Sequence, residues 1–337
     1  MPLPHRSIGP FNVSAVILGC MNLNHAYGDS PSEADSVALL NHALDLGCTM
    51  LDTASIYGAG RNEELVAKAV GHRRSEFVLS SKCVLYAVGE ERRVDGSPGA
   101  IREACDGSLA RLATDHIDLY HLHRLDPKAP IEDSVGALAD LVAAGKIGHI
   151  GLSEMSAATI RRAHAVHPIA VVQSEYSPWV RNPEVAVLDV CRELGIGFLA
   201  FSPTGRGFLA GAVRDTNYSP GDLRAVMPRF RSPQLEHNLK TYHSFAALAA
   251  EAGMAPAQLA IAWTLARAPH IAALPGTRSL THLEEDLAAA NIVLDEDLVA
   301  AVDALFVPGA IRGRRYTAEM QSTIDTELLP GEELEPA

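Results

Sequence analysis

The stretch that decides the fold runs from residue 117 to residue 153, and it contains 117-IDLYHL-122, 131-IEDSVGALADLVAAG-145 and 147-IGHIGLS-153. The two outer segments are short and largely apolar, as strands buried on both faces of a sheet are. The middle segment has apolar residues three and four positions apart and ends at a glycine, which favours a helix with a left-handed cap. The stretch therefore predicts two parallel strands joined by a crossover helix.

The same alternation extends in both directions along the chain. Short apolar segments predict strands over 14–19, 48–53, 77–82, 117–122, 147–153, 170–175, 197–202 and 271–276. Helical patterns occupy 33–47, 61–71, 100–112, 131–145, 156–166 and 184–195. Eight such units fit a (β/α)8 TIM barrel of ~250 residues with insertions better than two Rossmann halves. No break in composition divides the chain, so we expect a single domain over residues 1–337.

Two segments exceed what a minimal barrel needs. One is a long loop after the seventh strand, 205–238, and the other is an extended C-terminal tail from about residue 307. Long loops on the active-site face of a barrel are commonly lids or binding loops. The end of the tail, from about residue 330, is acidic and contains proline, and we expect it to be disordered.

Composition limits the partners of the protein. The chain has 28 basic and 41 acidic residues and a net charge of −13, which argues against nucleic acid or an anionic membrane as the main partner. No apolar run approaches the ~20 residues of a membrane span. Five scattered cysteines without C-x-x-C spacing indicate reduced thiols and a cytoplasmic location.

Polar side chains stand at or just beyond the ends of three predicted strands. Asp52 ends one apolar segment and Tyr57 follows in the adjoining loop, while Lys82 and His123 end two later segments. Burying such groups unpaired costs several kcal/mol, so packing alone does not explain them. The carboxyl ends of barrel strands meet at one face, where active sites lie. We therefore expect the four side chains to converge in one proton-transfer centre.

These four groups suit the protonation of a carbonyl oxygen. A free tyrosine has a pKa of about 10, and a neighbouring ammonium such as that of Lys82 would lower it. Asp52 would hold Lys82 by a buried ion pair, and His123 would orient a carbonyl oxygen toward Tyr57. Hydride would have to arrive from another molecule.

Several segments in the same order resemble the aldo-keto reductases, from about residue 5 to about residue 305. They are 50-MLDTASIYGAGRNEELV-66, 118-DLYHLHRLDP-127, 149-HIGLSE-154, 173-QSEYSPW-179, 190-VCRELGIGFLAFSPTGRGFLAG-211 and 274-LPGTRSLTHLEEDLAA-289. QSEYSPW and SPTGRGFLAG are similar to the microbial and plant branch of that superfamily. The resemblance implies an NADP-dependent enzyme that interconverts a carbonyl (aldehyde or ketone) and an alcohol. Tyr57 would be its general acid/base, Asp52 and Lys82 the pair that tunes it, and His123 the substrate-orienting residue.

The resemblance also implies which residues bind the cofactor. Ser153 and Gln173 would hold the nicotinamide carboxamide, and Phe201 would stack on the ring. Residues expected at the pyrophosphate are Ser202, Pro203, Thr204, Gly205, Arg206 and Gly207. Residues expected at the adenosine 2′-phosphate and the adenine are Gly276, Thr277, Arg278, His282, Glu285 and Asp286. Glu154, His282 and Asp286 differ from the residues most common at their positions. Met21 and Trp179 are expected to line the substrate pocket.

Two other functions remain as alternatives. Some relatives on this fold bind the cofactor tightly and act mainly as redox-sensing regulatory subunits. The H-x-H pair His121 and His123 also imitates the start of a metal site in barrel hydrolases. The later strand ends carry Ser, Gln and Gly, which do not complete a ligand set, so we expect no metal.

Overall fold

The computed structural model describes residues 2–24, 26–89, 91–329 and 332, and within them the main sheet has eight parallel strands. In order around the barrel these are β3 (Leu18–Gly19), β4 (Met50–Asp52), β5 (Val78–Cys83), β8 (Ile117–Leu122), β9 (Ile147–Ser153), β10 (Ile169–Glu175), β11 (Gly197–Phe201) and β12 (Ile271–Leu274). A parallel bridge between Val16 and Ala273 joins the two edges. The predicted (β/α)8 TIM barrel is therefore confirmed.

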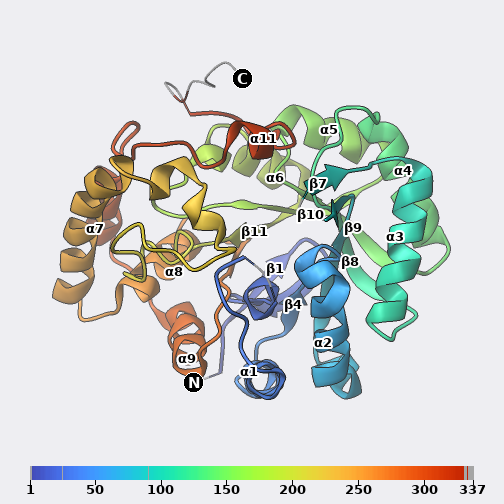
Figure 1. The fold of residues 1–337 in the computed structure, drawn as a ribbon, viewed down its shortest axis with the longest axis horizontal. Helices are drawn as coiled ribbons and strands as arrows, with labels where there is room; N and C mark the ends of the chain where they lie inside the picture. The colour runs from blue at the N-terminus through green and yellow to red at the C-terminus, as the bar shows by residue number, and fades with distance from the viewer. Residues whose placement is uncertain (1, 25, 90, 330–331, 333–337) are drawn as a thin grey trace.

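Helices surround the sheet (Figure 1). They are α1 (Glu33–Asp45), α2 (Arg61–Val70), α3 (Pro98–Arg111), α4 (Ile131–Ala143), α5 (Ala157–Val166), α6 (Val187–Leu194), α7 (Gln234–Glu251), α8 (Pro256–Ala266), α9 (Leu280–Ala288) and α10 (Glu296–Leu305). Helices α1, α3 and α5 are capped at their N-termini by Ser32, Ser97 and Ser156. The hydroxyls of these serines accept hydrogen bonds from backbone N–H groups of the first turn. Helix α6 ends at Gly195, which has the left-handed conformation expected of a glycine at the end of a helix. Gly71, after α2, is right-handed and leads into a 3-10 turn.

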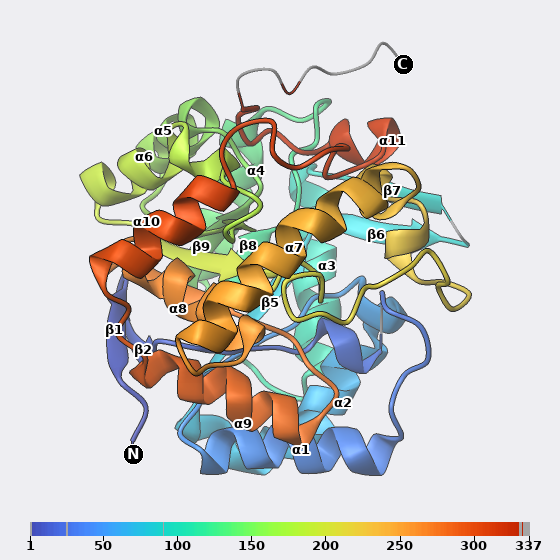
Figure 2. The ribbon, with the colours of Figure 1, turned by 90° about the vertical axis from the view of Figure 1, so that its left-hand side faces the viewer.

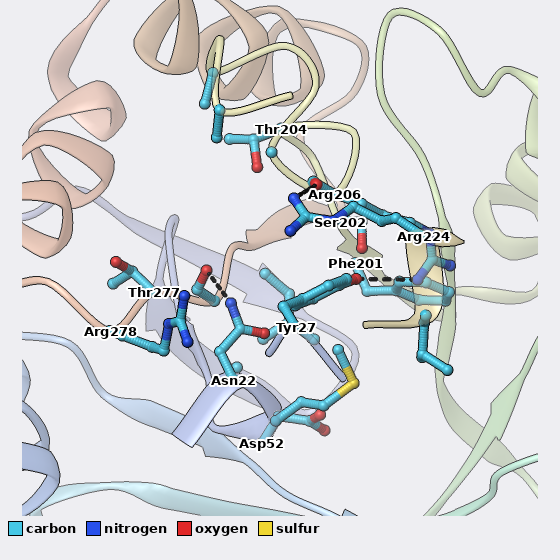
Figure 3. A pocket seen from close by; sticks show the side chains of 18 of the residues that line it. Asn22, Tyr27, Asp52, Phe201, Ser202, Thr204, Arg206, Arg224, Thr277 and Arg278 are labelled. Carbon is cyan, nitrogen blue, oxygen red and sulfur yellow. Dashed lines mark hydrogen bonds between the residues drawn. The ribbon is translucent and has the colours of Figure 1, made fainter. Parts of the chain in front are cut away.

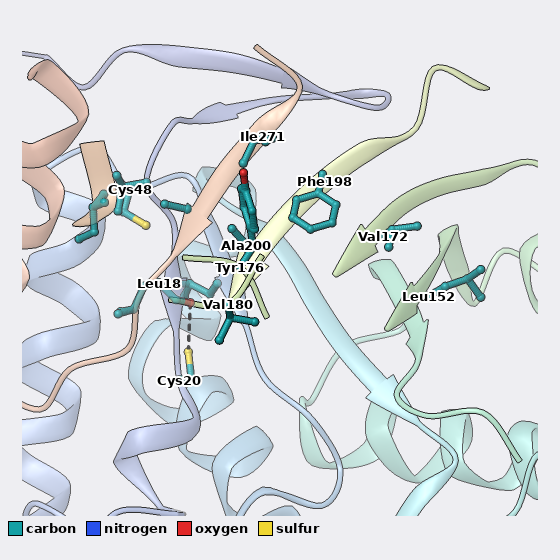
Figure 4. Packing of buried hydrophobic residues seen from close by; sticks show 14 of the residues in the cluster. Leu18, Cys20, Cys48, Leu152, Val172, Tyr176, Val180, Phe198, Ala200 and Ile271 are labelled. Carbon is teal, nitrogen blue, oxygen red and sulfur yellow. Dashed lines mark hydrogen bonds between the residues drawn. The ribbon is translucent and has the colours of Figure 1, made fainter. Parts of the chain in front are cut away.

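The core has an inner and an outer part, because successive side chains of a strand point to opposite faces. Val171 and Leu199 belong to a cluster inside the barrel together with Met50 and Leu119. Val172 and Phe198, each next to one of them in sequence and labelled in Figure 4, belong instead to the larger cluster, which also contains buried residues of the helices. Burial on both faces explains why the strands are largely apolar.

A hairpin that the sequence analysis did not predict precedes the barrel. Strands β1 (His5–Ile8) and β2 (Phe11–Ser14) pair antiparallel, and Ile8 and Val13 join the inner cluster. The turn between them lies close to the start of β10 and β11, since a Cβ at Gly9 would be 2.3 Å from the carbonyl oxygen of Ala170. The hairpin thus covers the end of the barrel at which β10 and β11 begin. The predicted first strand over 14–19 was wrong in extent, because β2 takes its first residue and β3 keeps only Leu18–Gly19.

The long loop after β11 is shorter than predicted because α7 already begins at Gln234. Residues 205–233 contain only short 3-10 turns, at Leu223–Ala225 and Pro228–Phe230. A second hairpin, β6 (Leu85–Val88) and β7 (Glu91–Val94), follows β5 and was also not predicted. Within the described ranges, no single helix is long and apolar enough to cross a membrane, and α7 and α8 meet these criteria only as a pair bent by 87°.

The C-terminal segment, from residue 307 to residue 329, lies over the same end of the barrel as β6 and β7. It contains the short helix α11 (Ala318–Gln321), which lies near β7 in both ribbon views (Figure 2). Asp325 accepts hydrogen bonds from the backbone N–H and the hydroxyl of Ser156, at 3.0 and 2.6 Å, at the start of α5. The disorder expected from about residue 330 concerns positions that, apart from residue 332, lie outside the described residues.

Candidate active site

The four polar residues at the predicted strand ends come together at one end of the barrel. Asp52 is the last residue of β4, Lys82 lies near the end of β5, His123 directly follows β8, and Tyr57 begins a 3-10 turn after β4. Lys82 forms an ion pair with Asp52, and its Nζ also donates to Thr53 O at 2.9 Å and to the Tyr57 hydroxyl at 3.3 Å. The rings of Tyr57 and His123 meet edge to face, with centroids 5.8 Å apart.

Burial and these neighbours set the protonation of the group. Burial raises the pKa of Tyr57, and the opposing effect of Lys82 offsets this only in part, so the pKa stays above its usual value. Burial would lower the pKa of Lys82, but Asp52 and Tyr57 raise it. Burial and the positive charge of Arg124 hold the pKa of His123 well below its usual range. At neutral pH the site therefore holds a phenol, an ammonium and a neutral imidazole.

Asp52 is held from two further sides. The Ser80 hydroxyl and the Gln173 amide donate to its Oδ2 at 2.7 and 3.0 Å. These bonds compensate the carboxylate for its burial, since a buried charge needs both a counter-ion and hydrogen bonds. The arrangement fixes the direction in which Lys82 presents its ammonium to Tyr57.

His121 lies behind the site. Its ring is fully buried, burial lowers its pKa to about 4, and its Nδ1 is 3.4 Å from the Ser80 hydroxyl. Gly151 leaves the space for this ring, because a Cβ there would be 2.2 Å from Cδ2 of His121. In the part of the chain that the structure describes, no group of three or more His, Cys, Asp and Glu side chains could hold a metal ion.

A cavity of about 650 Å³ opens beside Tyr57 and His123 and extends to α9. Figure 3 shows Asn22, Tyr27, Asp52 and Phe201 around it. Sequence-predicted residues that line the cavity are Met21, Asp52, Tyr57, His123, Ser153, Gln173, Phe201, Ser202, Thr204, Arg206, Gly207, Gly276, Thr277, Arg278, His282, Glu285 and Asp286. Lys82 is fully buried and does not line the cavity. It contacts Tyr57 and Asp52, which do.

Ser153 and Gln173 present complementary hydrogen-bonding groups. The Gln173 amide donates to Asp52, which leaves its carbonyl oxygen as an acceptor. The Ser153 hydroxyl accepts from Arg124 at 3.3 Å, which leaves its proton for donation. A carboxamide needs one acceptor for its NH2 group and one donor for its oxygen, so the pair fits the nicotinamide carboxamide.

The loop after β11 carries backbone strain next to the cavity. Ser202 and Arg206 have φ values of 51° and 58°, which are uncommon for residues with a Cβ. The Arg206 guanidinium pairs with Glu175 at 2.9 Å and donates to the Tyr27 and Tyr316 hydroxyls. Its charge is therefore compensated within the protein. The Arg206 guanidinium is therefore not free to bind an anion at this loop. Such an anion would more readily meet backbone N–H groups.

The other end of the cavity carries Arg278 in the loop before α9. Its guanidinium donates to the backbone oxygen of Asp29, and its side chain is exposed. Asn22 lies beside it and donates to Gly276 O at 2.8 Å, as drawn in Figure 3. Burial and the neighbouring Glu285 raise the pKa of Asp286 to about 8. This end therefore combines a cation with a carboxyl group that is largely protonated at neutral pH.

Three predicted residues lie away from the cavity surface. Trp179 is buried and stacks on Phe208 with centroids 4.2 Å apart, so the structure does not bring it to the pocket. Pro203 and Gly205 belong to the loop after β11 but do not line the cavity. Gly205 instead allows close packing, because a Cβ there would be 2.6 Å from Nε1 of Trp179.

Several residues around the cavity were not predicted from the sequence. Arg124 directly follows His123, and its place after a strand end was a usable signal. Arg92 in β7 and Tyr316 in the C-terminal segment carried no such signal, because only the tertiary fold places these segments at the barrel mouth. Glu154, next to Ser153, forms a buried ion pair with Arg315 of the C-terminal segment and does not line the cavity.

Comparison with known proteins agrees with this geometry. The family model for the aldo/keto reductase family matches residues 15–306. The glycerol dehydrogenase AKR11B4 from Gluconobacter oxydans is 29% identical, with 94% of this chain and 100% of that chain covered and a TM-score of 0.83. The aldo-keto reductase AKR11C1 from Bacillus halodurans, in its holo form, is 25% identical over 93% and 99% of the two chains, with a TM-score of 0.76.

A third solved structure is the thermostable aldo-keto reductase Tm1743 in complex with the inhibitor epalrestat. It is 27% identical, with 89% of this chain and 99% of that chain covered and a TM-score of 0.71. Members of the family typically use a nicotinamide cofactor. The match over most of the barrel, together with the cluster at its mouth, places this chain in the aldo/keto reductase family, oxidoreductases that act on carbonyl and alcohol groups.

Proposed function

We propose that this chain is an NADPH-preferring carbonyl reductase in which Tyr57 is the general acid, and the general base in the reverse direction. The observation that carries this proposal is the contact of Lys82 Nζ with the Tyr57 hydroxyl, 3.3 Å, beside His123 at the cavity wall. Because burial raises the pKa of Tyr57, the phenol keeps its proton at neutral pH and can give it to a carbonyl oxygen. Lys82 then stabilises the phenolate that remains.

His123 supports the same step. As a neutral imidazole it can donate one N–H to the carbonyl oxygen, and this donor and Tyr57 together stabilise the negative charge that develops there. When bound, NADPH would supply the hydride for the carbonyl carbon. Ser153 and Gln173 would hold its carboxamide, Phe201 would face the ring, and Arg278 would pair with the 2′-phosphate.

The test is a panel of aldehydes, ketones and alcohols, each measured with NADPH or NADP⁺ and with NADH or NAD⁺. Steady turnover of at least one carbonyl compound, faster at limiting NADPH than at limiting NADH, is the expected result. Tight cofactor binding without turnover of any compound would instead favour a redox-sensing role. Equal kcat/KM for the two cofactors would overturn the NADPH preference alone.

A further inference from the structure

Two guanidinium groups line the cavity at its catalytic end. Arg124 directly follows His123, and Arg92 belongs to β7 of the hairpin after β5. The charges of both lower the pKa of His123, and the charge of Arg124 also lowers that of Tyr57. Arg124 follows His123 and donates to the Ser153 hydroxyl, so its guanidinium lies at this end of the cavity, and Arg92 lines the same cavity. Arg278, the cation expected at the 2′-phosphate, belongs to the loop before α9.

The Arg124 guanidinium is fixed on one side only. Its Nη1 donates to His123 O at 2.6 Å and to the Ser153 hydroxyl at 3.3 Å. Among the residues that the structure describes, no carboxylate forms an ion pair with Arg124, and no acceptor meets its Nε or Nη2. The bonds of Nη1 orient the group, and the remaining N–H donors are available to a ligand in the cavity.

Two further cations near this end are neutralised by carboxylates. Lys82 pairs with Asp52, and Arg206 pairs with Glu175 at 2.9 Å. Glu285 and Asp286, the other described carboxyl groups at the cavity wall, belong to α9 near Arg278. Arg124 is therefore a positive charge at this end that no described carboxylate neutralises. Burial and the nearby charge of Arg124 lower the pKa of Arg92, as expected when like charges share a partly buried site.

We propose that the carbonyl substrate carries an anionic group, a carboxylate or a phosphate, which Arg124 and Arg92 bind while Tyr57 and His123 contact the carbonyl oxygen. Guanidinium groups suit both anions, because their N–H donors match two oxygens at once. The inference rests on the proposed function and leaves its chemistry unchanged. Hydride still goes to the carbonyl carbon and the Tyr57 proton goes to the oxygen. Neither arginine forms or breaks a covalent bond.

The experiment compares two matched pairs of aldehydes with NADPH. Succinic semialdehyde is compared with its methyl ester, and glyceraldehyde 3-phosphate with glyceraldehyde, so that one pair probes a carboxylate and the other a phosphate. We expect the wild type to prefer the anionic member of at least one pair by about tenfold or more in kcat/KM. Charge-assisted hydrogen bonds of this kind correspond to roughly ten- to hundredfold effects.

Variants at Arg124 separate charge recognition from a structural role. Arg124→Met should lower the anionic-to-neutral ratio of kcat/KM about ten- to hundredfold, mainly through a higher KM for the anionic member. The ratio cancels any loss that arises because Arg124 also contacts Ser153. Arg124→Lys should retain part of the preference, since it keeps the charge but not the two-pronged geometry. Arg92→Met should act in the same direction as Arg124→Met.

Arg93→Met is the matched control. Arg93 is next to Arg92, is exposed and pairs with Glu91, so its loss should leave the ratio unchanged. No preference for the anionic member in either pair would overturn the inference, as would equal losses for both members in Arg124→Met. Turnover of the neutral members without such a preference leaves the proposed function intact. Absence of turnover with all four aldehydes, and with the wider panel, would overturn both.

Discussion

Arg315 in the C-terminal segment meets Glu154 at the end of β9 in a two-pronged, fully buried ion pair. Its Nη1 and Nη2 lie 3.2 and 3.1 Å from the two oxygens of Glu154. Thr326 donates to the same carboxylate at 3.0 Å, and Arg315 also lies 3.6 Å from Glu175. Burial would raise the pKa of Glu175, but Arg206 and Arg315 lower it. The pair therefore ties the C-terminal segment to the strand ends that carry the active site.

We expect Glu154→Gln and Arg315→Met each to lower the free energy of unfolding by about 3–5 kcal/mol, because each leaves a buried charge without its partner. The double variant Glu154→Gln/Arg315→Met should cost clearly less than the sum of the two. Denaturant unfolding of the four proteins gives the coupling energy. Additive losses would show that the two side chains do not act as a pair.

Tyr57→Phe should lower kcat about 10²–10⁴-fold, because it removes the acid that protonates the carbonyl oxygen. The Kd of NADPH should change little, since the hydroxyl acts at the substrate. Tyr86→Phe, at an exposed tyrosine of β6, serves as the control and should keep wild-type activity. Retention of more than a third of the wild-type kcat, with hydride transfer rate-limiting, would show that Tyr57 is not the acid.

Lys82→Met should shift the pH dependence of alcohol oxidation. Lys82 lowers the pKa of Tyr57, and the ionised Tyr57 is the base in this direction, so losing the ammonium should move the rising limb to higher pH. Stability should also fall by about 3–5 kcal/mol, because Asp52 stays buried without its partner.

The control for this variant is Lys68→Met, which removes an exposed ion pair with Glu33. Its cost should stay below about 1 kcal/mol and its pH profile should match that of the wild type. A profile that Lys82→Met leaves unaltered would exclude Lys82 from the proton transfer.

Arg278→Ala should weaken the binding of NADPH by roughly ten- to hundredfold and that of NADH much less, because only NADPH carries the 2′-phosphate. Thr277, at the same end of the cavity, is unchanged in the variant, so binding should not vanish. Arg231→Ala, at an exposed position outside the cavity, is the control. Dissociation constants for both cofactors decide the matter, and equal losses would place Arg278 away from the phosphate.

Asp286 should make the stability of the cofactor-free protein depend on pH. Its pKa is about 8 in the folded chain against a usual value of 3.8, so between these values the folded state binds a proton that the unfolded state has released. The free energy of unfolding should therefore fall as pH rises from about 4 to about 8 and then level off. Asp286→Asn should lack this contribution, and the difference between the two pH profiles measures it. Parallel profiles would mean that folding does not raise the pKa of Asp286.

The sequence by itself determined the barrel and the four polar residues that meet at one end of it. Strands such as β8 and β9 are largely apolar because both faces are buried, and helices such as α4 show apolar residues three and four positions apart, so local patterns suffice to predict them. Asp52, Lys82 and His123 could be assigned to one site because parallel strand ends share one face of the barrel.

Only the tertiary structure decided what surrounds that centre. Trp179 packs on Phe208 instead of facing the cavity, and the Arg206 charge is taken by Glu175. Arg92 and Tyr316 reach the cavity from a hairpin and from the C-terminal segment. Neither segment has a hydrophobic period or a motif that predicts its position. Contacts between segments so far apart in sequence depend on how each folds back over the barrel, and local patterns carry no information about that.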